Sequence, residues 1–328
     1  MKYLVTGGAG FIGHNVVRQL ESLGHECFIL DSVTDYGFVP KDELKYLYRA
    51  RRDRMRSNTH HVDLRNAELV ENWFLSFSFK ADAVIHLASF PRQKVVSANP
   101  VWGAEVMGTG LVHLLEMTKR YHIPKFVYVS SSMVYGDFDD QVTEDYNCRP
   151  QGQYGIMKLM GEHLVKDYTR RGCFDHVIIR PSAVYGEYDV EDRVVSKFML
   201  GAMRGHVLKV NGANETLDFT YVEDAARGIA QATLSDRAVN GTYNITKSHS
   251  MSLLKAAELA VSIAGRGTIE CRDKDADFPS RGALCIDRAR ADFDFDPQVD
   301  VEEGFQLYHK WFTESTYWQQ KLKSPSSV

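Results

Sequence analysis

Tyr154 and Lys158 have the residue types and the spacing of a proton-transferring pair. They stand four residues apart, and at that spacing in a helix both side chains project from the same face. An ammonium beside a phenol favours the phenolate, so we expect Tyr154 to exchange a proton near neutral pH. Such a pair can assist the oxidation of a sugar hydroxyl while hydride moves to a nicotinamide. The spacing is common on exposed helices, so the prediction depends on the surrounding elements.

Three serines, Ser130, Ser131 and Ser132, stand at the end of a strand predicted at residues 126–131. A hydroxyl there would face the same rim as the helix that carries Tyr154. It could polarise the group being oxidised and share the proton transfer. Serines at a strand end are also common turn formers, so the serines alone do not decide between the two interpretations.

A glycine-rich loop opens the chain, between an apolar strand at residues 2–5 and a helix that Gly24 ends. Gly7, Gly10 and Gly13 permit a tight turn, a close backbone approach to a pyrophosphate and close packing of the helix on the strand. The helix start supplies free amides and a favourable dipole for that anion. The pattern predicts a dinucleotide site.

Asp31 ends the next predicted strand, at residues 26–31. This is the separation from the glycines expected of an acid that binds the adenosine ribose. Its carboxylate would accept hydrogen bonds from the ribose hydroxyls and repel a 2′-phosphate, which favours NAD over NADP. The alternative is that Asp31 is only a turn residue.

Further strands are predicted at residues 59–64, 83–88, 126–131 and 176–181, alternating with amphipathic helices. The first of them would carry Asp63, a plausible adenine contact. The pattern predicts an α/β fold: a Rossmann-type, doubly wound parallel sheet with ligands at the carboxyl ends of its strands. We assign 1–186 to an NAD-binding domain with a returning segment near 215–250. Residues 187–320 would mainly form a smaller, discontinuous substrate-binding portion, and 321–328 a disordered tail.

Composition excludes several classes of protein. The 328 residues are 44% hydrophobic and 25% charged, with a net charge of -4, which gives no reason to expect nucleic acid or an anionic membrane as partner. The basic run 49–56 is interpreted as a solvated helix face or loop. Five scattered cysteines indicate reduced thiols, with neither disulfides nor a metal site. With no signal peptide and no membrane-spanning run, we expect a soluble, cytoplasmic protein.

Taken together, the motifs resemble the extended short-chain dehydrogenase/reductase family, in its nucleotide-sugar epimerase/dehydratase branch. The resemblance runs from Thr6 to about Pro297. Its markers are residues 6–13, Asp63-Leu64, His86-Leu87-Ala88-Ser89, the Ser-Ser-Ser-Met-Val-Tyr-Gly run at 130–136, Tyr154 with Lys158, residues 180–186 and residues 218–224.

The resemblance implies a tightly bound NAD, a nucleotide-diphosphate sugar as substrate, and catalysis by Ser131, Tyr154 and Lys158. It also implies a homodimer joined by helices at about 103–121 and 153–170. The implied cofactor-binding residues are Gly7, Gly10, Phe11, Ile12, Gly13, Asp31, Asp63, Leu64, Leu87, Ala88, Tyr154 and Lys158.

Met133 bears on the reaction type. Dehydratases and the related decarboxylase of this family carry an acid at that position, so its absence favours oxidation and re-reduction at one carbon, as in a 4-epimerase. Three alternatives remain: a 4,6-dehydratase whose acid lies elsewhere, at Glu187 or Glu105; a 4-keto reductase or dehydrogenase; and a non-catalytic NAD-binding sensor. An intact Tyr154 and Lys158 argue against the sensor.

The substrate contacts are less well defined by the resemblance. Arg281 matches a family arginine that contacts the diphosphate, and a guanidinium suits that anion. Lys94, Ser132, Met133 and Arg193 are the other substrate-binding candidates, and the bulky, basic loop 90–94 is expected to border the pocket. Ala183, Leu217 and Glu105 replace residues that many members use there, so UDP-hexose is only the default substrate class.

Overall fold

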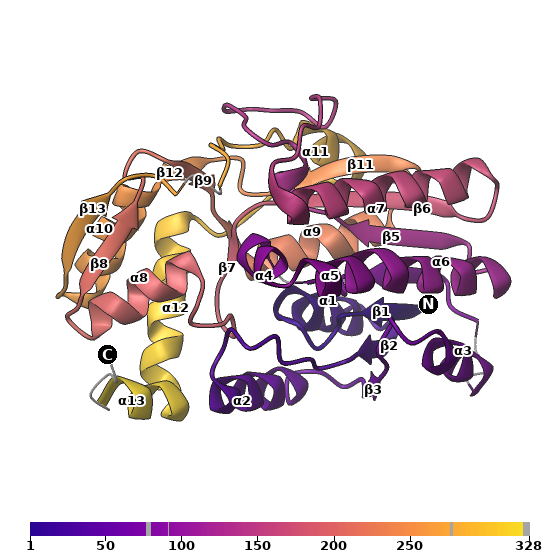
Figure 1. Ribbon diagram of the computed structural model, residues 1–328, viewed down its shortest axis with the longest axis horizontal. Coiled ribbons are helices and arrows are strands. Elements are labelled where there is room, and N and C mark those ends of the chain that lie inside the picture. Colours follow the sequence, from indigo (N-terminus) through magenta and orange to yellow (C-terminus); the bar gives the residue numbers. More distant parts are fainter. Residues whose placement is uncertain (77–79, 91, 276–277, 324–328) are drawn as a thin grey trace.

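A seven-stranded parallel sheet forms the centre of the protein (Figure 1). The computed structural model describes residues 1–76, 80–90, 92–275 and 278–323. The sheet confirms the predicted Rossmann-type α/β fold, in the order β11-β6-β5-β4-β1-β2-β3. Its strands are β1 (Lys2–Thr6), β2 (Glu26–Asp31), β3 (Thr59–His61), β4 (Ala83–His86), β5 (Lys125–Val129), β6 (Asp175–Pro181) and β11 (Gly241–Ile245).

Three strands are shorter than the sequence predicted. They end at His61, His86 and Val129, and not at residues 64, 88 and 131. β3 ends opposite Asp31, the last residue of β2, and β4 ends opposite Thr6, the last residue of β1. Asp63, Ala88 and Ser131 therefore lie in loops beyond the carboxyl edge of the sheet.

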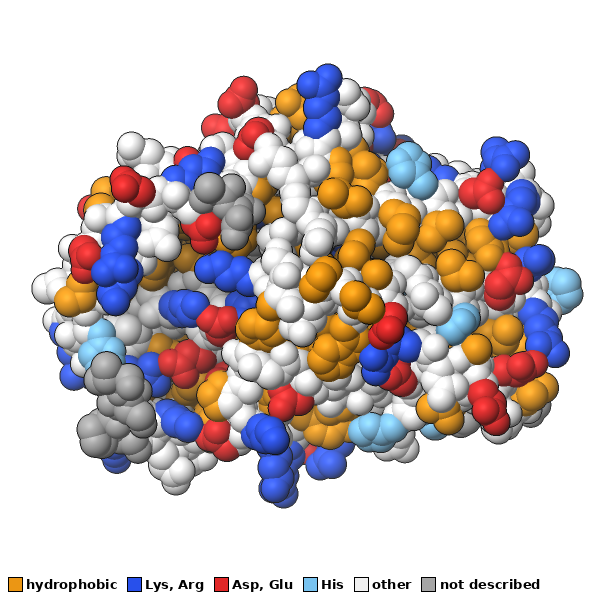
Figure 2. Space-filling model, viewed as in Figure 1, with side chains coloured by type: hydrophobic (Ala, Val, Ile, Leu, Met, Phe, Trp, Pro, Cys, Tyr) orange, Lys and Arg blue, Asp and Glu red, His pale blue; other side chains and the backbone are white. Residues whose placement is uncertain are grey.

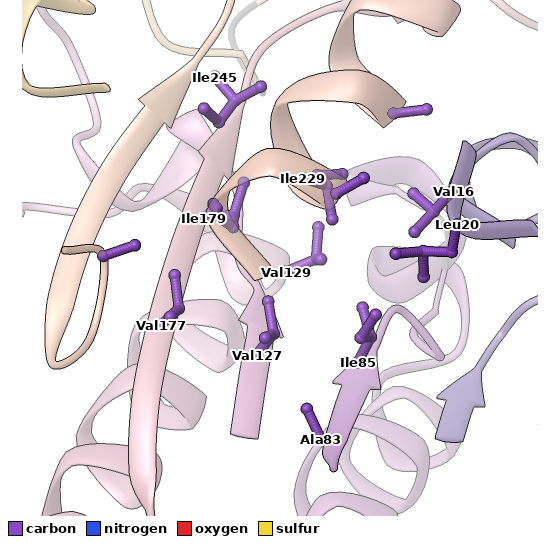
Figure 3. Packing of buried hydrophobic residues seen from close by; sticks show 14 of the residues in the cluster. Val16, Leu20, Ala83, Ile85, Val127, Val129, Val177, Ile179, Ile229 and Ile245 are labelled. Carbon is purple, nitrogen blue, oxygen red and sulfur yellow. The ribbon is translucent and has the colours of Figure 1, made fainter. Parts of the chain in front are cut away.

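Helices cover both faces of the sheet. On one face lie α1 (Phe11–Ser22), α9 (Val222–Leu234) and α11 (Asp287–Phe293), which share one apolar cluster with the strands (Figure 3). On the other face lie α3 (Ala67–Ser76), α6 (Gly110–Arg120) and α7 (Gly152–Arg170). Burial on both faces explains why the strands are apolar almost throughout.

The chain returns to this sheet twice after residue 187. β11 pairs in parallel with β6, and the segment from Ile286 to Phe295 packs into the same core as α1. The Phe295 ring lies against Gly228 of α9, where a Cβ would come within 2.7 Å of it. The sequence identified the β11 return but not the one at 286–295.

The remaining elements form a second, smaller body with its own core. Its helices are α8 (Val194–Met203), α10 (Leu253–Ala264), α12 (Val301–Glu314) and α13 (Thr316–Lys323). Three two-stranded sheets accompany them: β7 (Val184–Tyr185) with β10 (Thr220–Tyr221), β9 (Thr216–Asp218) with β12 (Ser250–Ser252), and β8 (Val207–Asn211) with β13 (Thr268–Arg272).

The helix α2 (Lys41–Arg52) joins the two bodies. Its Tyr46 stacks on Tyr317 of α13, with ring centroids 4.3 Å apart, and Lys321 lies 2.7 Å from the Asp42 carboxylate. The prediction of a disordered tail from 321 is therefore wrong for residues 321–323, which are the end of α13; residues 324–328 lie outside the described part.

The interpretation of the basic run 49–56 as a solvated face is wrong for Arg51 and Arg54, whereas Arg49, Arg52 and Arg56 are exposed. Arg51 is buried and donates from Nε and Nη2 to the Tyr188 carbonyl, at 3.0 and 2.6 Å. The guanidinium of Arg54 lies 4.3 Å from the centre of the Tyr188 ring. These contacts connect α2 to the segment that follows β7. Among the described helices, none is both long and apolar enough to span a membrane.

Replacing Phe295 with Ala tests whether residues 286–295 belong to the main core. The cavity left by this fully buried ring should lower the free energy of unfolding by about 3–5 kcal/mol in urea denaturation. Leu75→Ala, at an exposed position, is the control and should change it by about 0.5 kcal/mol or less. A loss below about 1 kcal/mol for Phe295→Ala would contradict the assignment.

Candidate active site

A cavity of about 1090 Å³ runs along the carboxyl edge of the sheet, between the two bodies. Charged side chains of both signs border the hollow between them in Figure 2. Its wall includes every residue that the sequence singled out for catalysis, cofactor binding or substrate binding. The structure thus brings together residues from Gly7 to Arg281 at one site. Pro91, in the predicted loop 90–94, lies outside the described residues.

The glycine loop is shaped to receive an anion. Gly7 has a φ of +72°, and a Cβ on Gly13 would lie 2.1 Å from the Gly7 carbonyl oxygen. The helix α1 starts after Gly10 with no side-chain cap, so the amides of its first turn are available to a ligand. A pyrophosphate fits this cradle, and larger residues would fill it.

Asp31 faces the same part of the cavity. Its carboxylate accepts hydrogen bonds from the amides of Ala9 (3.0 Å) and Val33 (2.8 Å). Burial raises the pKa of Asp31, while these hydrogen bonds and the charge of Arg51 oppose the rise. The acid is therefore fixed in place beside the glycine loop, as a ribose-binding group requires.

Asp63 has a partner that the sequence analysis did not anticipate. Arg65 donates to both oxygens of its carboxylate, with Nε 3.0 Å from each and Nη2 2.6 Å from Oδ2. These hydrogen bonds lower the pKa of Asp63. An adenine amino group would meet an ionised carboxylate here, held by the neighbouring arginine.

The end of β5 holds three successive turns of α7. The carbonyl of Val129 accepts a hydrogen bond from Lys158 Nζ at 2.8 Å, and Ser130 Oγ donates to Glu162 at 2.6 Å. The next residue, Ser131, acts on the phenol of Tyr154 and opposes the rise in its pKa. Consecutive residues of one strand end thus fix the two members of the predicted pair.

The charge that opposes the rise in the pKa of Tyr154 belongs to Arg193, and not to Lys158 as the sequence predicted. Burial raises the pKa of Tyr154, and the opposing influences are the charge of Arg193 and the hydrogen bond with Ser131. Lys158 Nζ lies 5.9 Å from the centre of the Tyr154 ring, and burial lowers the pKa of Lys158 to about 7. Arg193, predicted as a substrate ligand, thus also acts on the phenol.

Glu162 is a site residue that the sequence analysis missed. It is 1% exposed and forms a bidentate ion pair with Arg180, at 2.9 Å from Nε and 2.6 Å from Nη2. Its charge raises the pKa of Lys158 and so opposes the effect of burial there. The signal was available: Glu162 follows Lys158 by four residues, on the same helix face.

The substrate-binding candidates occupy the far end of the cavity. Arg281 has a buried Nε with no hydrogen-bond partner in the described structure, and burial lowers its pKa to about 10. Arg193 Nε lies 3.8 Å from Asp189, whereas Lys94 is exposed and lies 3.6 Å from Asp275. Ser132 and Met133 are buried in the wall. A bound anion would accept a hydrogen bond from the unpartnered Nε of Arg281.

The two acids considered as stand-ins for a dehydratase acid do not face the substrate. Glu187 hydrogen-bonds Tyr221, and Glu105 forms a surface ion pair with Arg65 at 3.4 Å. Neither belongs to the cavity wall within the described residues. Met133 occupies the position where those enzymes carry the acid.

Comparison with known proteins supports the family resemblance found in the sequence. The sequence model of the NAD dependent epimerase/dehydratase family matches residues 3–246. The uncharacterised UDP-glucose epimerase YtcB of Bacillus subtilis is 29% identical over 313 residues, which are 93% of this chain and 95% of that protein. A dTDP-glucose 4,6-dehydratase of Streptomyces niveus is 28% identical, over 100% of this chain and 97% of its own.

Among solved structures, the UDP-glucose 4-epimerase of Thermus thermophilus in complex with NAD is similar, with a TM-score of 0.84 and 26% identity. The match covers 96% of this chain and 100% of that one. NAD is the cofactor of the matched family, and the glycine cradle, the free amides of α1 and Asp31 fit it.

Replacing Asp31 with Ala should weaken NAD binding and relax discrimination against NADP. Loss of hydrogen bonds to a charged acceptor costs about 1.5–3 kcal/mol, or roughly 10- to 150-fold in Kd. Titration calorimetry of cofactor-stripped protein measures both affinities. Asp53→Ala, at the exposed end of α2, is the control. Tight binding of NADP by the unmodified protein would contradict the prediction.

Replacing Glu162 with Gln should be strongly destabilising, because it leaves the Arg180 guanidinium buried without its counter-charge. The expected loss in the free energy of unfolding is about 3–5 kcal/mol. Glu71→Gln, which breaks the exposed pair with Arg120, is the matched control and should cost about 1 kcal/mol or less. Equal losses for the two variants would show that burial of the Arg180 pair has no special effect.

Proposed function

This chain belongs to the NAD-dependent epimerase/dehydratase family, and we propose that within it the protein is a nucleotide-sugar epimerase that inverts C4 of a hexose. One observation carries the choice of reaction: Ser131, Tyr154 and Lys158 share a cavity wall with Met133. The groups for proton transfer at one carbon are present there. The acid that elimination requires is absent from the position where dehydratases of the family carry it.

The residues have separate tasks in this mechanism. Bound NAD supplies a hydride acceptor and donor. In its phenolate form, Tyr154 takes the proton from the C4 hydroxyl and later returns it to the same oxygen, while Ser131 hydrogen-bonds that oxygen. Lys158 is held by the Val129 carbonyl close to Tyr154, and the charge of Glu162 opposes the fall in the pKa of Lys158 that burial causes. Inversion at C4 requires the keto sugar to turn in the cavity before Tyr154 returns the proton to the C4 oxygen.

Arg281 and Arg193 are the proposed ligands of the substrate diphosphate. The unpartnered Nε of Arg281 and the weak pairing of Arg193 leave both guanidinium groups with donors for an anion. Lys94 lies at the rim and would contribute charge only. A UDP-hexose is the proposed substrate class, supported by the UDP-glucose epimerases among the relatives and solved structures.

Assembly and location are also part of the proposal. Apolar side chains stand exposed on α5 (Pro100–Ala104), α6 and α7, where hydrophobic atoms gather in Figure 2. They are Val101, Val112, Ile156 and Met160. This patch would join two copies in a homodimer. A cytoplasmic location agrees with the five cysteines, all of which are free.

The reaction is tested by incubating the purified protein with UDP-, GDP-, CDP- and dTDP-sugars and no added cofactor. We expect a product of unchanged mass with inverted C4, identified by mass spectrometry and NMR. A product lighter by one water would replace the proposal with a dehydratase. A reaction that starts only when NAD or NADH is supplied would replace it with a dehydrogenase or ketoreductase.

Replacing Tyr154 with Phe should abolish turnover while the protein stays folded and keeps its NAD. The ring and its packing remain, but the group that carries the proton is lost, which removes at least about 10²–10⁴-fold in rate. Turnover is followed by NMR, and NAD content by release on denaturation. Tyr146→Phe, on an exposed tyrosine, is the control. Undiminished turnover by Tyr154→Phe would exclude Tyr154 as the proton carrier.

A further inference from the structure

The helix α7 that carries Tyr154 receives its N-terminal cap from a distant residue. Gln151 at the N-cap position makes no side-chain capping bond. The backbone amide of Tyr154, in the first turn, instead donates to Gln93 Oε1 at 3.1 Å. Amides in a first helical turn have no partner within the helix, so this bond satisfies a donor that would otherwise be unpaired.

Gln93 is itself held in place. It lies in α4 (Gln93–Ala98), is 6% exposed, and its Nε2 donates to Ser97 Oγ at 3.1 Å. Gly152, the first residue of α7, has a φ of +76°, and a Cβ there would lie 2.1 Å from Gln93 Nε2. Only glycine at 152 allows this close approach. The two segments therefore fit each other at the start of the catalytic helix.

Arg92 and Lys94, the neighbours of Gln93, contact the second, smaller body, which is called the substrate-binding body from here on. Arg92 donates to both the backbone carbonyl and the carboxylate of Asp192, just before α8. Lys94 pairs with Asp275, which follows β13, at 3.6 Å. Three consecutive side chains thus reach three places around the cavity: Asp192, the amide of Tyr154, and Asp275. A shift of the substrate-binding body would be transmitted to α4.

We propose that Gln93 is the positioning residue for Tyr154, acting through the backbone of that residue and not on the substrate. By accepting the Tyr154 amide it fixes the start of α7, and with it the phenol relative to Ser131. Arg92 and Lys94 link this cap to the substrate-binding body. The inference rests on the proposed function for its catalytic consequence, but not for the cap itself.

The catalytic consequence is tested with two substitutions of similar size. Gln93→Met removes the acceptor, and we expect kcat to fall about ten- to hundredfold with KM within about twofold, because a small displacement of a catalytic group has effects of that size. Gln93→Glu keeps an acceptor oxygen and should restore kcat to within about threefold of the unmodified protein. The assay follows conversion of whichever nucleotide sugar the protein accepts.

The cap is tested without any assay of activity, by amide hydrogen exchange at residues 152–158. Gln93→Met should speed exchange at the start of α7 at least about tenfold, and Gln93→Glu should leave it near the value for the unmodified protein. Gln153→Met makes the same chemical change on an exposed side chain in the same turn, and should leave both exchange and kcat unchanged.

The possible outcomes separate the two proposals. Faster exchange and lower kcat in Gln93→Met, both rescued in Gln93→Glu, support the positioning role. Unchanged exchange in Gln93→Met, or a kcat within twofold of the unmodified protein, overturns it. Equal losses of kcat in the Met and Glu variants also overturn it, because the acceptor oxygen would then be irrelevant. If the unmodified protein converts no nucleotide sugar, the proposed function fails, while the exchange result still decides whether Gln93 is the cap.

Discussion

The buried ion pair between Arg180 and Glu162 is the interaction on which the arrangement of the site depends. Arg180 is the penultimate residue of β6 and Glu162 lies in α7, so the pair ties the catalytic helix to the sheet. Two charges so deeply buried are stable only when both are hydrogen-bonded. Ser130 adds a third contact to Glu162, and Arg180 also donates to the hydroxyl of Tyr135 at 2.9 Å. The result is a buried polar network that joins β6 and the end of β5 to α7, while Ser131 and Tyr154 line the cavity.

Polar and aromatic contacts from α2 and α4 are among those that join the two bodies. α2 reaches both the segment after β7, through Arg51, and α13, through the stacked Tyr46 and Tyr317. α4 reaches the substrate-binding body from the opposite side through Arg92 and Lys94. Interfaces of this polar kind permit relative motion more readily than apolar ones.

The glycine-loop end of the cavity and the end with Arg193 and Arg281 differ in the charge of their side chains. The glycine loop offers amides and no side-chain cation, so it meets a pyrophosphate without competing ion pairs. Arg193 and Arg281 stand toward the substrate end, where Leu217 and Ala183 have removed contacts that many family members use. The charge of Arg193 also opposes the rise in the pKa of Tyr154. A bound diphosphate that neutralised Arg193 would therefore weaken one of the two influences that favour the phenolate.

Features that depend on short-range order were predictable from the sequence. Hydrophobic periodicity and turn residues predicted the alternating strands and helices, and spacing within single motifs identified the glycine loop, Asp31, and Tyr154 with Lys158. The tertiary structure alone decided which distant residues meet: Gln93 at the amide of Tyr154, Arg180 at Glu162, Arg51 at Tyr188, and Phe295 in the main core. It also decided where strands end and that Lys321 continues a helix. Local pattern cannot fix such contacts, because the burial and pairing of a polar side chain depend on residues that only packing brings near it.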